Sequence, residues 1–438
     1  MTTDTSPLPP SAPLGVRRFL ARPWLLAFVP VSAATSGFGV ALPLLILIPL
    51  HGAWTDVALA AALYNGAAIL ASIAWGRVAD RFAVRRTLLL LTYGGFGVAY
   101  LALANVHSIP ALLVLYTFTG LVAPAGGNAA SLLLLERFGN GERPLAIASY
   151  NWMNILGAIA GLLAGYGWLA AGYPLSPLLY VLAALVFASF AWVWIGVRDL
   201  PRSRGPGPLH TPMIQRFHIP ELSLAAWGRL RQWAGGGSHR ALAWVLAATF
   251  LFNLTANLYN ISYTPYLYSV GVGAAAIFLV NLSNSLAQGL VYPFSGTWTN
   301  REGAGRVVRR STGLRAGGYL ATAALTLVPL TAAAAFFSNA WIYAVLGAAV
   351  AFYATSSSVL TYQALERHEA GLMLGLAGAL GGIAAIAGAA LSGLFSVYGS
   401  YRLAFLVSGV GLLLSVPLWN WATAAVDRTR TTGASIPP

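Results

Sequence analysis

Twelve apolar runs, each long enough to cross a lipid bilayer as a helix, limit what this 438-residue chain can fold into. A bilayer core needs about 20 consecutive apolar residues per helix. The runs lie at 24–49, 54–76, 86–105, 109–135, 144–171, 176–197, 240–267, 273–298, 314–336, 339–364, 370–397 and 402–424. Only 8% of the residues are charged, against about 25% in soluble domains. The sequence therefore predicts an all-α integral membrane protein with twelve transmembrane helices.

The break between the sixth and seventh runs divides the chain into two halves. Residues 198–239 begin Pro- and Gly-rich and then mix Leu, Ala and Trp with Arg. This pattern predicts a linker that carries a short amphipathic helix at the membrane surface. The predicted segments are an N-terminal tail (1–22), a first six-helix bundle (23–197), this linker (198–239), a second six-helix bundle (240–425) and a C-terminal tail (426–438).

The basic residues, all of them arginine, predict the orientation in the membrane. A net charge of +14 also occurs in nucleic-acid-binding proteins. Here, however, the arginines are divided among short segments between apolar runs, as the positive-inside rule requires. In this layout all but one of the 25 basic residues fall on one side, Arg402 being the exception. Arg315, at the very start of the ninth run, is counted with the segment that precedes it. We therefore expect both termini to be cytoplasmic, and no nucleic-acid partner.

Neutral polar side chains recur on single faces of two predicted helices. Asn253, Asn257 and Asn260 share one face, and Asn281, Asn284 and Gln288 share another. An amide that faces lipid leaves its donors unsatisfied, at a cost of several kcal/mol, so both faces should meet other helices or a water-filled cavity. Three amides in line favour a cavity. The remaining candidate substrate-binding residues are Ser32, Thr35, Ser36, Asn65, Asn128, Asn151, Asn154 and Tyr353. For single residues such as Asn65 and Asn128, hydrogen bonding between helices is an equal alternative.

Acidic and histidine side chains fall at predicted helix ends or in loops. No carboxylate or imidazole is predicted at mid-membrane, where it could carry a proton. For the same reason we expect no catalytic residues, no metal site, no cofactor and no enzymatic activity. An interior that holds amides and hydroxyls but no ionised side chain suits an uncharged, hydroxylated or amphipathic solute.

The segment GRVADRFAVRR at 76–86 carries the most specific motif in the chain. Asp80 follows Gly76 by four residues, and Arg81 comes next. This arrangement resembles the loop between the second and third helices of the major facilitator superfamily. Two positions depart from the family pattern, because Ala83 replaces its second glycine and Val84 its next basic residue. A weaker copy in the second half begins at Gly296, with Asn300 and Arg301 in the places of Asp80 and Arg81.

The resemblance implies a transporter that works by alternating access between two halves, with the solute held near mid-membrane. It assigns Gly76, Asp80, Arg81 and Arg137 to a gate on the cytoplasmic side. Leu162 replaces the proline of the family's antiporter motif, which argues against a typical proton/drug antiporter. The same motif's glycines correspond to Gly157, Gly161 and Gly165, and their small size predicts close helix packing.

We therefore expect a monomeric, multi-pass cell-membrane transporter whose partners are a small-molecule solute and membrane lipid. Because no buried acid is predicted, facilitated diffusion or coupling through a group at a helix end is expected. Two alternatives remain: a multidrug or metabolite efflux permease, and a non-transporting membrane sensor with the same fold.

Overall fold

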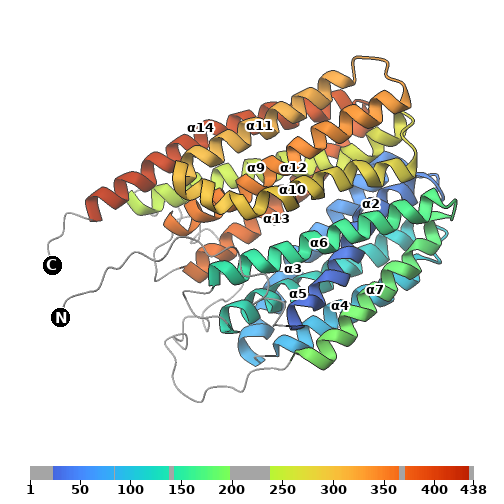
Figure 1. Ribbon diagram of the computed structural model, residues 1–438, viewed down its shortest axis with the longest axis horizontal. Coiled ribbons are helices and arrows are strands. Elements are labelled where there is room, and N and C mark those ends of the chain that lie inside the picture. The colour runs from blue at the N-terminus through green and yellow to red at the C-terminus, as the bar shows by residue number, and fades with distance from the viewer. Residues whose placement is uncertain (1–22, 83, 138–142, 198–236, 365–369, 434–438) are drawn as a thin grey trace.

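The computed structural model describes residues 23–82, 84–137, 143–197, 237–364 and 370–433, and every regular element in these ranges is helical (Figure 1). A short 3-10 helix, η1 (Pro23–Ala27), precedes the first long helix. The first half contains α2 (Phe28–Leu47), α3 (Trp54–Phe82), α4 (Arg85–Leu103), α5 (Ile109–Arg137), α6 (Arg143–Ala170) and α7 (Leu175–Gly196). The second half contains α9 (Gly237–Ser269), α10 (Ala274–Glu302), α11 (Ala304–Leu325), α12 (Ala332–Ala364), α13 (Ala370–Val397) and α14 (Tyr401–Gly433).

The two halves repeat the same packing. In the first half α2 packs against α6 and α7, and α4 packs against α5 and α7. In the second half α9 packs against α13 and α14, and α11 packs against α12 and α14. Each helix of the first half thus has a counterpart with the same neighbours in the second, which is a parallel internal repeat.

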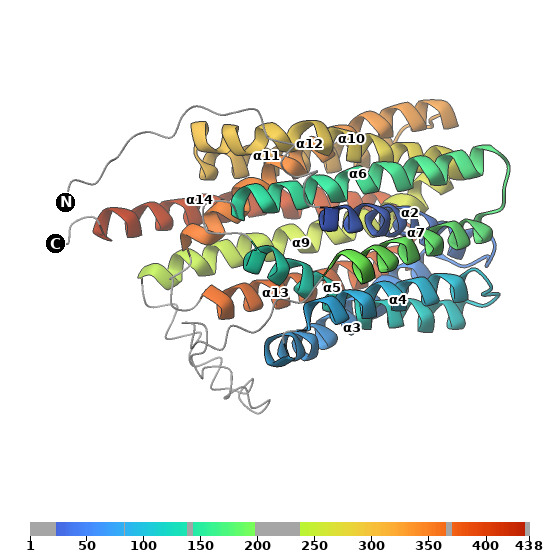
Figure 2. The same cartoon turned by 60° about the horizontal axis from the view of Figure 1, so that its bottom comes forward.

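Two helix pairs make most of the contact between the halves, α3 with α13 and α6 with α10. Figure 1 shows the two bundles side by side, and Figures 1 and 2 show their helices nearly parallel. Glycines bring both pairs close together. On α13, Gly382 lies against Ile69 of α3, and on α6, Gly165 lies against Phe278 of α10. The end of the bundle at which α2 joins α3 and α13 joins α14 is called the far end below (right in Figure 1).

Within the first half, two more glycines of α6 bring it against α2. A Cβ at Gly157 or Gly161 would overlap the carbonyl oxygens of Val29 and Ala33, respectively. Only a residue without a side chain fits this contact, so the close packing predicted for these glycines is confirmed.

The described ranges contain twelve long helices, as predicted, and eleven of these are long and apolar enough to cross a membrane. The other one, α11, differs from the prediction in its start. It begins at Ala304, ten residues before the predicted run, directly after Gly303 ends α10 with a φ of 86°. Four arginines in its first twelve residues lower its hydropathy, and this concealed the helix start.

The early start of α11 corrects two predictions about charge. Arg315 is the twelfth residue of the helix, about 16 Å from its beginning at 1.5 Å per residue, and its side chain is only 8% exposed. The assignment of Arg315 to a connecting segment is therefore wrong. The prediction that the interior holds no ionised side chain is wrong for the same reason.

Two predicted segments lie wholly or largely outside the described residues: the N-terminal tail and the linker with its amphipathic helix. Of the predicted C-terminal tail, residues 426–433 are described and belong to α14. The second bundle begins slightly earlier than predicted, since α9 starts at Gly237. At the other end, α14 continues through Gly433, past the predicted boundary at 425.

Candidate solute site

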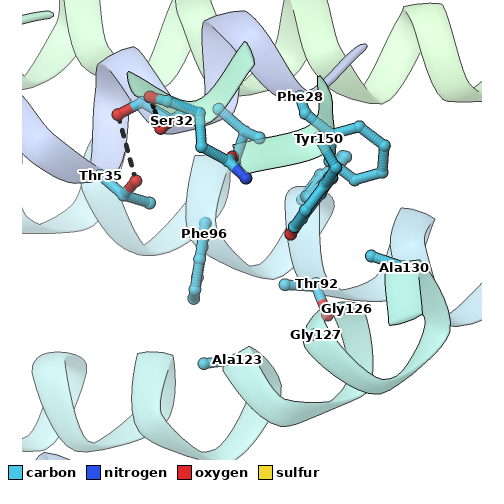
Figure 3. A pocket seen from close by; sticks show the side chains of 13 residues that line it. Phe28, Ser32, Thr35, Thr92, Phe96, Ala123, Gly126, Gly127, Ala130 and Tyr150 are labelled. Atoms are coloured by element: carbon cyan, nitrogen blue, oxygen red, sulfur yellow. Dashed lines mark hydrogen bonds between the residues drawn. The ribbon is translucent and has the colours of Figure 1, made fainter. Parts of the chain in front are cut away.

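A cavity of about 140 Å³ lies inside the first half, between α2, α4, α5 and α6 (Figure 3). Three of the predicted substrate-binding residues line it, Ser32 and Thr35 from α2 and Asn154 from α6. The other lining residues are Phe28, Val31, Thr92, Tyr93, Phe96, Ala123, Gly126, Gly127, Ala130 and Tyr150. None of the lining residues carries a charge at neutral pH, so the cavity offers aromatic faces, hydroxyls and one amide.

The hydroxyl groups of this cavity also hold its walls together. Ser32 Oγ donates to the carbonyl oxygen of Asn154 at 2.7 Å, which joins α2 to α6. Thr92 Oγ1 donates to the carbonyl oxygen of Val122 at 2.8 Å, which joins α4 to α5. The ring of Phe28 meets that of Tyr150 edge-on, with centroids 4.9 Å apart. Figure 3 shows the Tyr150 ring and Phe96 on opposite sides of the space. The cavity therefore has fixed walls.

Two of its lining glycines leave space in different ways. A Cβ at Gly126 would lie 2.9 Å from Thr92 Cγ2, so this glycine permits the close approach of α4. A Cβ at Gly127 would meet nothing within 4 Å. Position 127 therefore borders open space that a larger side chain would fill.

The other candidates in the first half do not line this cavity. Ser36 and Asn151 are partly buried, and each follows a lining residue, Thr35 or Tyr150, in the sequence. Asn65 donates to the carbonyl oxygen of Ala61 on its own helix at 2.8 Å. Asn128 lies on α5, but its side chain is outside the described part of the structure.

The predicted amide face of α9 packs on α13. Asn257 donates to the carbonyl oxygen of Asn253 at 2.8 Å. A Cβ at Gly388 of α13 would lie 2.9 Å from Asn257 Cβ, and one at Gly381 would lie 3.5 Å from Asn253 Nδ2. Asn260, by contrast, is exposed. Two of the three amides therefore meet a helix, and the structure does not gather all three around one space.

The predicted amide face of α10 meets α12. Asn284 Nδ2 donates to the carbonyl oxygen of Tyr343 at 2.9 Å, and Asn284 Oδ1 accepts from Gln288 Nε2 at 2.6 Å. Asn281 bonds within its own helix, to the carbonyl oxygen of Ile277. The remaining candidate of this half, Tyr353 on α12, is buried and stacks on Phe252 with centroids 3.4 Å apart.

The four predicted gate residues lie at the end opposite the far end. Gly76, Asp80 and Arg81 belong to the last two turns of α3, and Arg137 is the last residue of α5. Their side chains are outside the described part of the structure, so their gating role stays a prediction.

At the far end the structure shows a contact between the halves that the sequence did not indicate. Trp54 Nε1 donates to Ser392 Oγ at 2.9 Å, and Ser392 Oγ lies 3.0 Å from Ser262 Oγ. The Trp54 ring also stacks on Tyr401, with centroids 4.4 Å apart. This chain of contacts joins α3 to α13, α9 and α14. In the sequence this contact is marked only by a tryptophan at the start of an apolar run, and tryptophan is common at the ends of membrane helices.

Metal-binding side chains do not gather within the described ranges, where no group of three His, Cys, Asp or Glu residues is present.

The sequence matches the family profile described as Major Facilitator Superfamily over residues 24–234 and 245–436. Curated relatives include Multidrug resistance protein MdtG of Yersinia enterocolitica, 31% identical over 125 residues, which are 28% of this chain and 30% of the relative. MdtG of Salmonella paratyphi C is 28% identical over 209 residues, 45% of this chain and 49% of the relative. These matches span about half or less of the relatives' length.

Solved structures show the same fold at low identity. The nucleoside transporter NupG is 14% identical with a TM-score of 0.67, and covers 92% of this chain and 99% of its own. A POT family transporter in complex with a thioalcohol-conjugated peptide is 12% identical with a TM-score of 0.72, covering 93% and 96%. The profile match over both halves, with the repeated helix packing, shows that the chain is a multi-pass membrane protein of the major facilitator superfamily.

Proposed function

We propose that this transporter moves a small, uncharged, amphipathic solute by alternating access, and that the cavity of the first half holds an apolar ring of that solute. The observation that supports this proposal is the lining of the cavity, which combines four aromatic rings with hydroxyls and an amide but has no charged group. Apolar walls with a few placed polar groups are typical of small-molecule sites.

The volume of the cavity limits what fits in this conformation. A dry protein cavity of about 150 Å³ accommodates benzene, whereas sites for drug-sized ligands usually measure about 300–1,000 Å³. At about 140 Å³ the cavity holds one ring-sized group. A larger solute would extend beyond it.

Alternating access requires contacts between the halves that can form and break. The Trp54–Ser392 hydrogen bond and the Trp54–Tyr401 stack join the halves at the far end. We propose that they close this end in the present state and separate when it opens. Gly76, Asp80, Arg81 and Arg137 are proposed to form the gate at the opposite end.

Efflux of lipophilic compounds is the second candidate function. The observation that favours it is the similarity to relatives named as multidrug resistance proteins. An exporter and an importer of neutral solutes would share the same cavity, so direction of transport separates the two candidates.

Uptake into proteoliposomes made with the purified protein tests the proposed solute class. The solutes should be matched pairs that share a ring and differ in one charge, such as phenyl glucoside and phenyl glucuronide. We expect saturable uptake of neutral members and little uptake of anionic ones, because the cavity has no cation to neutralise a carboxylate. Preferential uptake of the anionic members would contradict the proposal. Accumulation of the solute against its gradient, driven by a proton gradient, would contradict facilitated diffusion but not the proposed solute class.

A further inference from the structure

Arg315 lies in the middle of α11, inside the second half, with only 8% of its side chain exposed. Its guanidinium carbon sits 4.8 Å from the centroid of the Phe252 ring and 5.4 Å from that of Tyr319. Its Nε donates to the Tyr319 hydroxyl at 2.6 Å. Phe252 in turn stacks on Tyr353. The cation therefore lies against aromatic rings from α9 and α11, and a ring of α12 stacks on that of α9.

No carboxylate balances this charge in the part of the chain that the structure describes. The one ion pair seen there joins Arg310 to Glu302, at the start of α11. Asp56 accepts a hydrogen bond from the backbone N–H of Ala53 at the far end. Within the described ranges Arg315 makes one hydrogen bond, from its Nε to the Tyr319 hydroxyl. No described residue accepts a hydrogen bond from the two terminal nitrogens of the guanidinium, so these can bind another acceptor.

A second polar group near this cation also lacks a partner. The Tyr353 hydroxyl is buried beside Thr249 and Ser357 but makes no hydrogen bond of normal geometry with a described residue. Because the Tyr353 ring stacks on the Phe252 ring that Arg315 covers, the Tyr353 hydroxyl and the Arg315 guanidinium belong to the same aromatic cluster.

The fold itself does not require a cation at this position. The internal repeat that aligns Gly76 with Gly296 pairs Arg315 of α11 with Gly95 of α4. At Gly95 the helix simply packs on Val122, to which a Cβ there would come within 3.1 Å. The first half thus has no charged residue at the equivalent position.

Aromatic faces attract a cation but do not neutralise its charge. They also do not accept the hydrogen bonds that the guanidinium N–H groups donate in the plane of the group. An arginine keeps its charge when buried, and a buried charge is costly unless it is paired and hydrogen-bonded. We propose that Arg315 is an anion-binding site within the second half, which takes a small monovalent anion such as chloride. The acid group of a small solute shares the same chemistry.

This site goes beyond the proposed transport of an uncharged solute, because it lies in the other half from the solute cavity. Its function would be to hold α9, α11 and α12 together in an anion-dependent way. The stability of the protein should then depend on the anion present, whatever the solute is.

Thermal unfolding of the purified full chain tests the site. The midpoint of unfolding is measured in gluconate, as the reference anion, and then with gluconate replaced by chloride, nitrate or benzoate. The ionic strength is held constant, so that charge screening does not change. For wild type we expect chloride and nitrate to raise the midpoint by roughly 3 °C over gluconate. Arg315→Gln should lose this shift, and Arg315→Lys, which keeps the charge but not the planar fork, should retain part of it. Arg306→Gln is the matched control, since Arg306 is exposed on the same helix, and should behave as wild type.

Three results would overturn the proposal. The first is a midpoint for wild type that does not differ between chloride and gluconate, which needs no variant and applies even if Arg315→Gln does not fold. The second is an equal anion shift in Arg315→Gln and Arg306→Gln, which would indicate a general salt effect. The third is stabilisation by benzoate alone, which would assign the site to the acid group of a solute.

Discussion

Asn284 shows at the scale of one residue how a polar side chain in this bundle serves the fold. Both ends of its amide are used, the Nδ2 on the carbonyl oxygen of Tyr343 and the Oδ1 on Gln288. A Cβ at Gly347 would overlap the carbonyl oxygen of Asn284, so α12 lies directly against this turn of α10. The hydrogen bond therefore spans a tight helix contact.

Replacing Asn284 by Ala should destabilise the protein, because it removes the bond between α10 and α12. Hydrogen bonds between membrane helices contribute about 0.6 kcal/mol on average and up to about 2. We expect a lower midpoint of thermal unfolding in detergent. The control is Asn260→Ala, which alters an exposed amide and should leave the midpoint near wild type. Equal midpoints for the two variants would show that the Asn284 bond is not stabilising.

Sequence alone picks out part of the polar lining of the cavity. Ser32, Thr35 and Asn154 are polar residues in predicted helices, and the structure brings them to one cavity; that they bind a solute stays a prediction. Sequence could not show that Asn284 is satisfied by a backbone carbonyl, because this depends on which helix lies alongside. Nor could it place Arg315, since a hydropathy average assigns an arginine to the nearest polar segment.

At the scale of elements, the tightest contact in the first half is that of α6 with α2. Gly157 and Gly161 lie one turn apart on α6, each against a backbone carbonyl of α2. The spacing of these glycines was visible in the sequence and predicted close packing. The sequence did not show that α2 is the partner helix, because a row of small residues can pack against any of several neighbouring helices.

A Gly161→Val variant should fold poorly, because its side chain would overlap the Ala33 carbonyl oxygen and separate the two helices. Overpacking of this kind typically costs about 1–3 kcal/mol, and sometimes more. Gly167→Val is the control, since a Cβ at Gly167 on the same helix meets nothing within 4 Å. Size-exclusion profiles and unfolding midpoints measure both. A monodisperse Gly161→Val protein with the wild-type midpoint would show that α2 and α6 can separate freely.

At the scale of the whole molecule, two halves with equivalent packing meet along α3–α13 and α6–α10. The repeat was predictable, because Gly296, Asn300 and Arg301 copy the spacing of Gly76, Asp80 and Arg81. The Trp54–Ser392 contact across the halves was not, since it joins residues far apart in sequence whose types are common at helix ends.

Trp54→Phe should shift the molecule towards a state that is open at the far end. Phenylalanine keeps a ring for Tyr401 but loses the donor to Ser392, and one hydrogen bond is worth about 1 kcal/mol, or roughly fivefold in population. The chain has no cysteine, so a single Ala58→Cys near Gly393 of α13 reports on the interface. Maleimide should label it faster in Trp54→Phe. Trp168→Phe is the control, since Trp168 bonds to Pro174 within one half. Unchanged labelling in both variants would exclude a gating role for Trp54.

The gate proposed at the opposite end makes a separate prediction. Asp80→Asn removes the charge that the motif places beside Arg81, so transport should fall while folding and membrane insertion are retained. Uptake by proteoliposomes with matched protein content measures this. Uptake equal to wild type would mean that the carboxylate has no gating role.

The account as a whole depends on the cavity between α2, α4, α5 and α6 being part of the transport path. Gly127→Leu fills this cavity, because a Cβ at position 127 points into open space, and Gly167→Leu adds the same side chain at an equally open position that does not line the cavity. The decisive measurement compares uptake of a neutral, ring-containing solute by proteoliposomes of the two variants. We expect Gly127→Leu to lose roughly tenfold or more, equivalent to about 1.4 kcal/mol of binding, and Gly167→Leu to match wild type. Wild-type uptake by a folded Gly127→Leu protein would contradict the account.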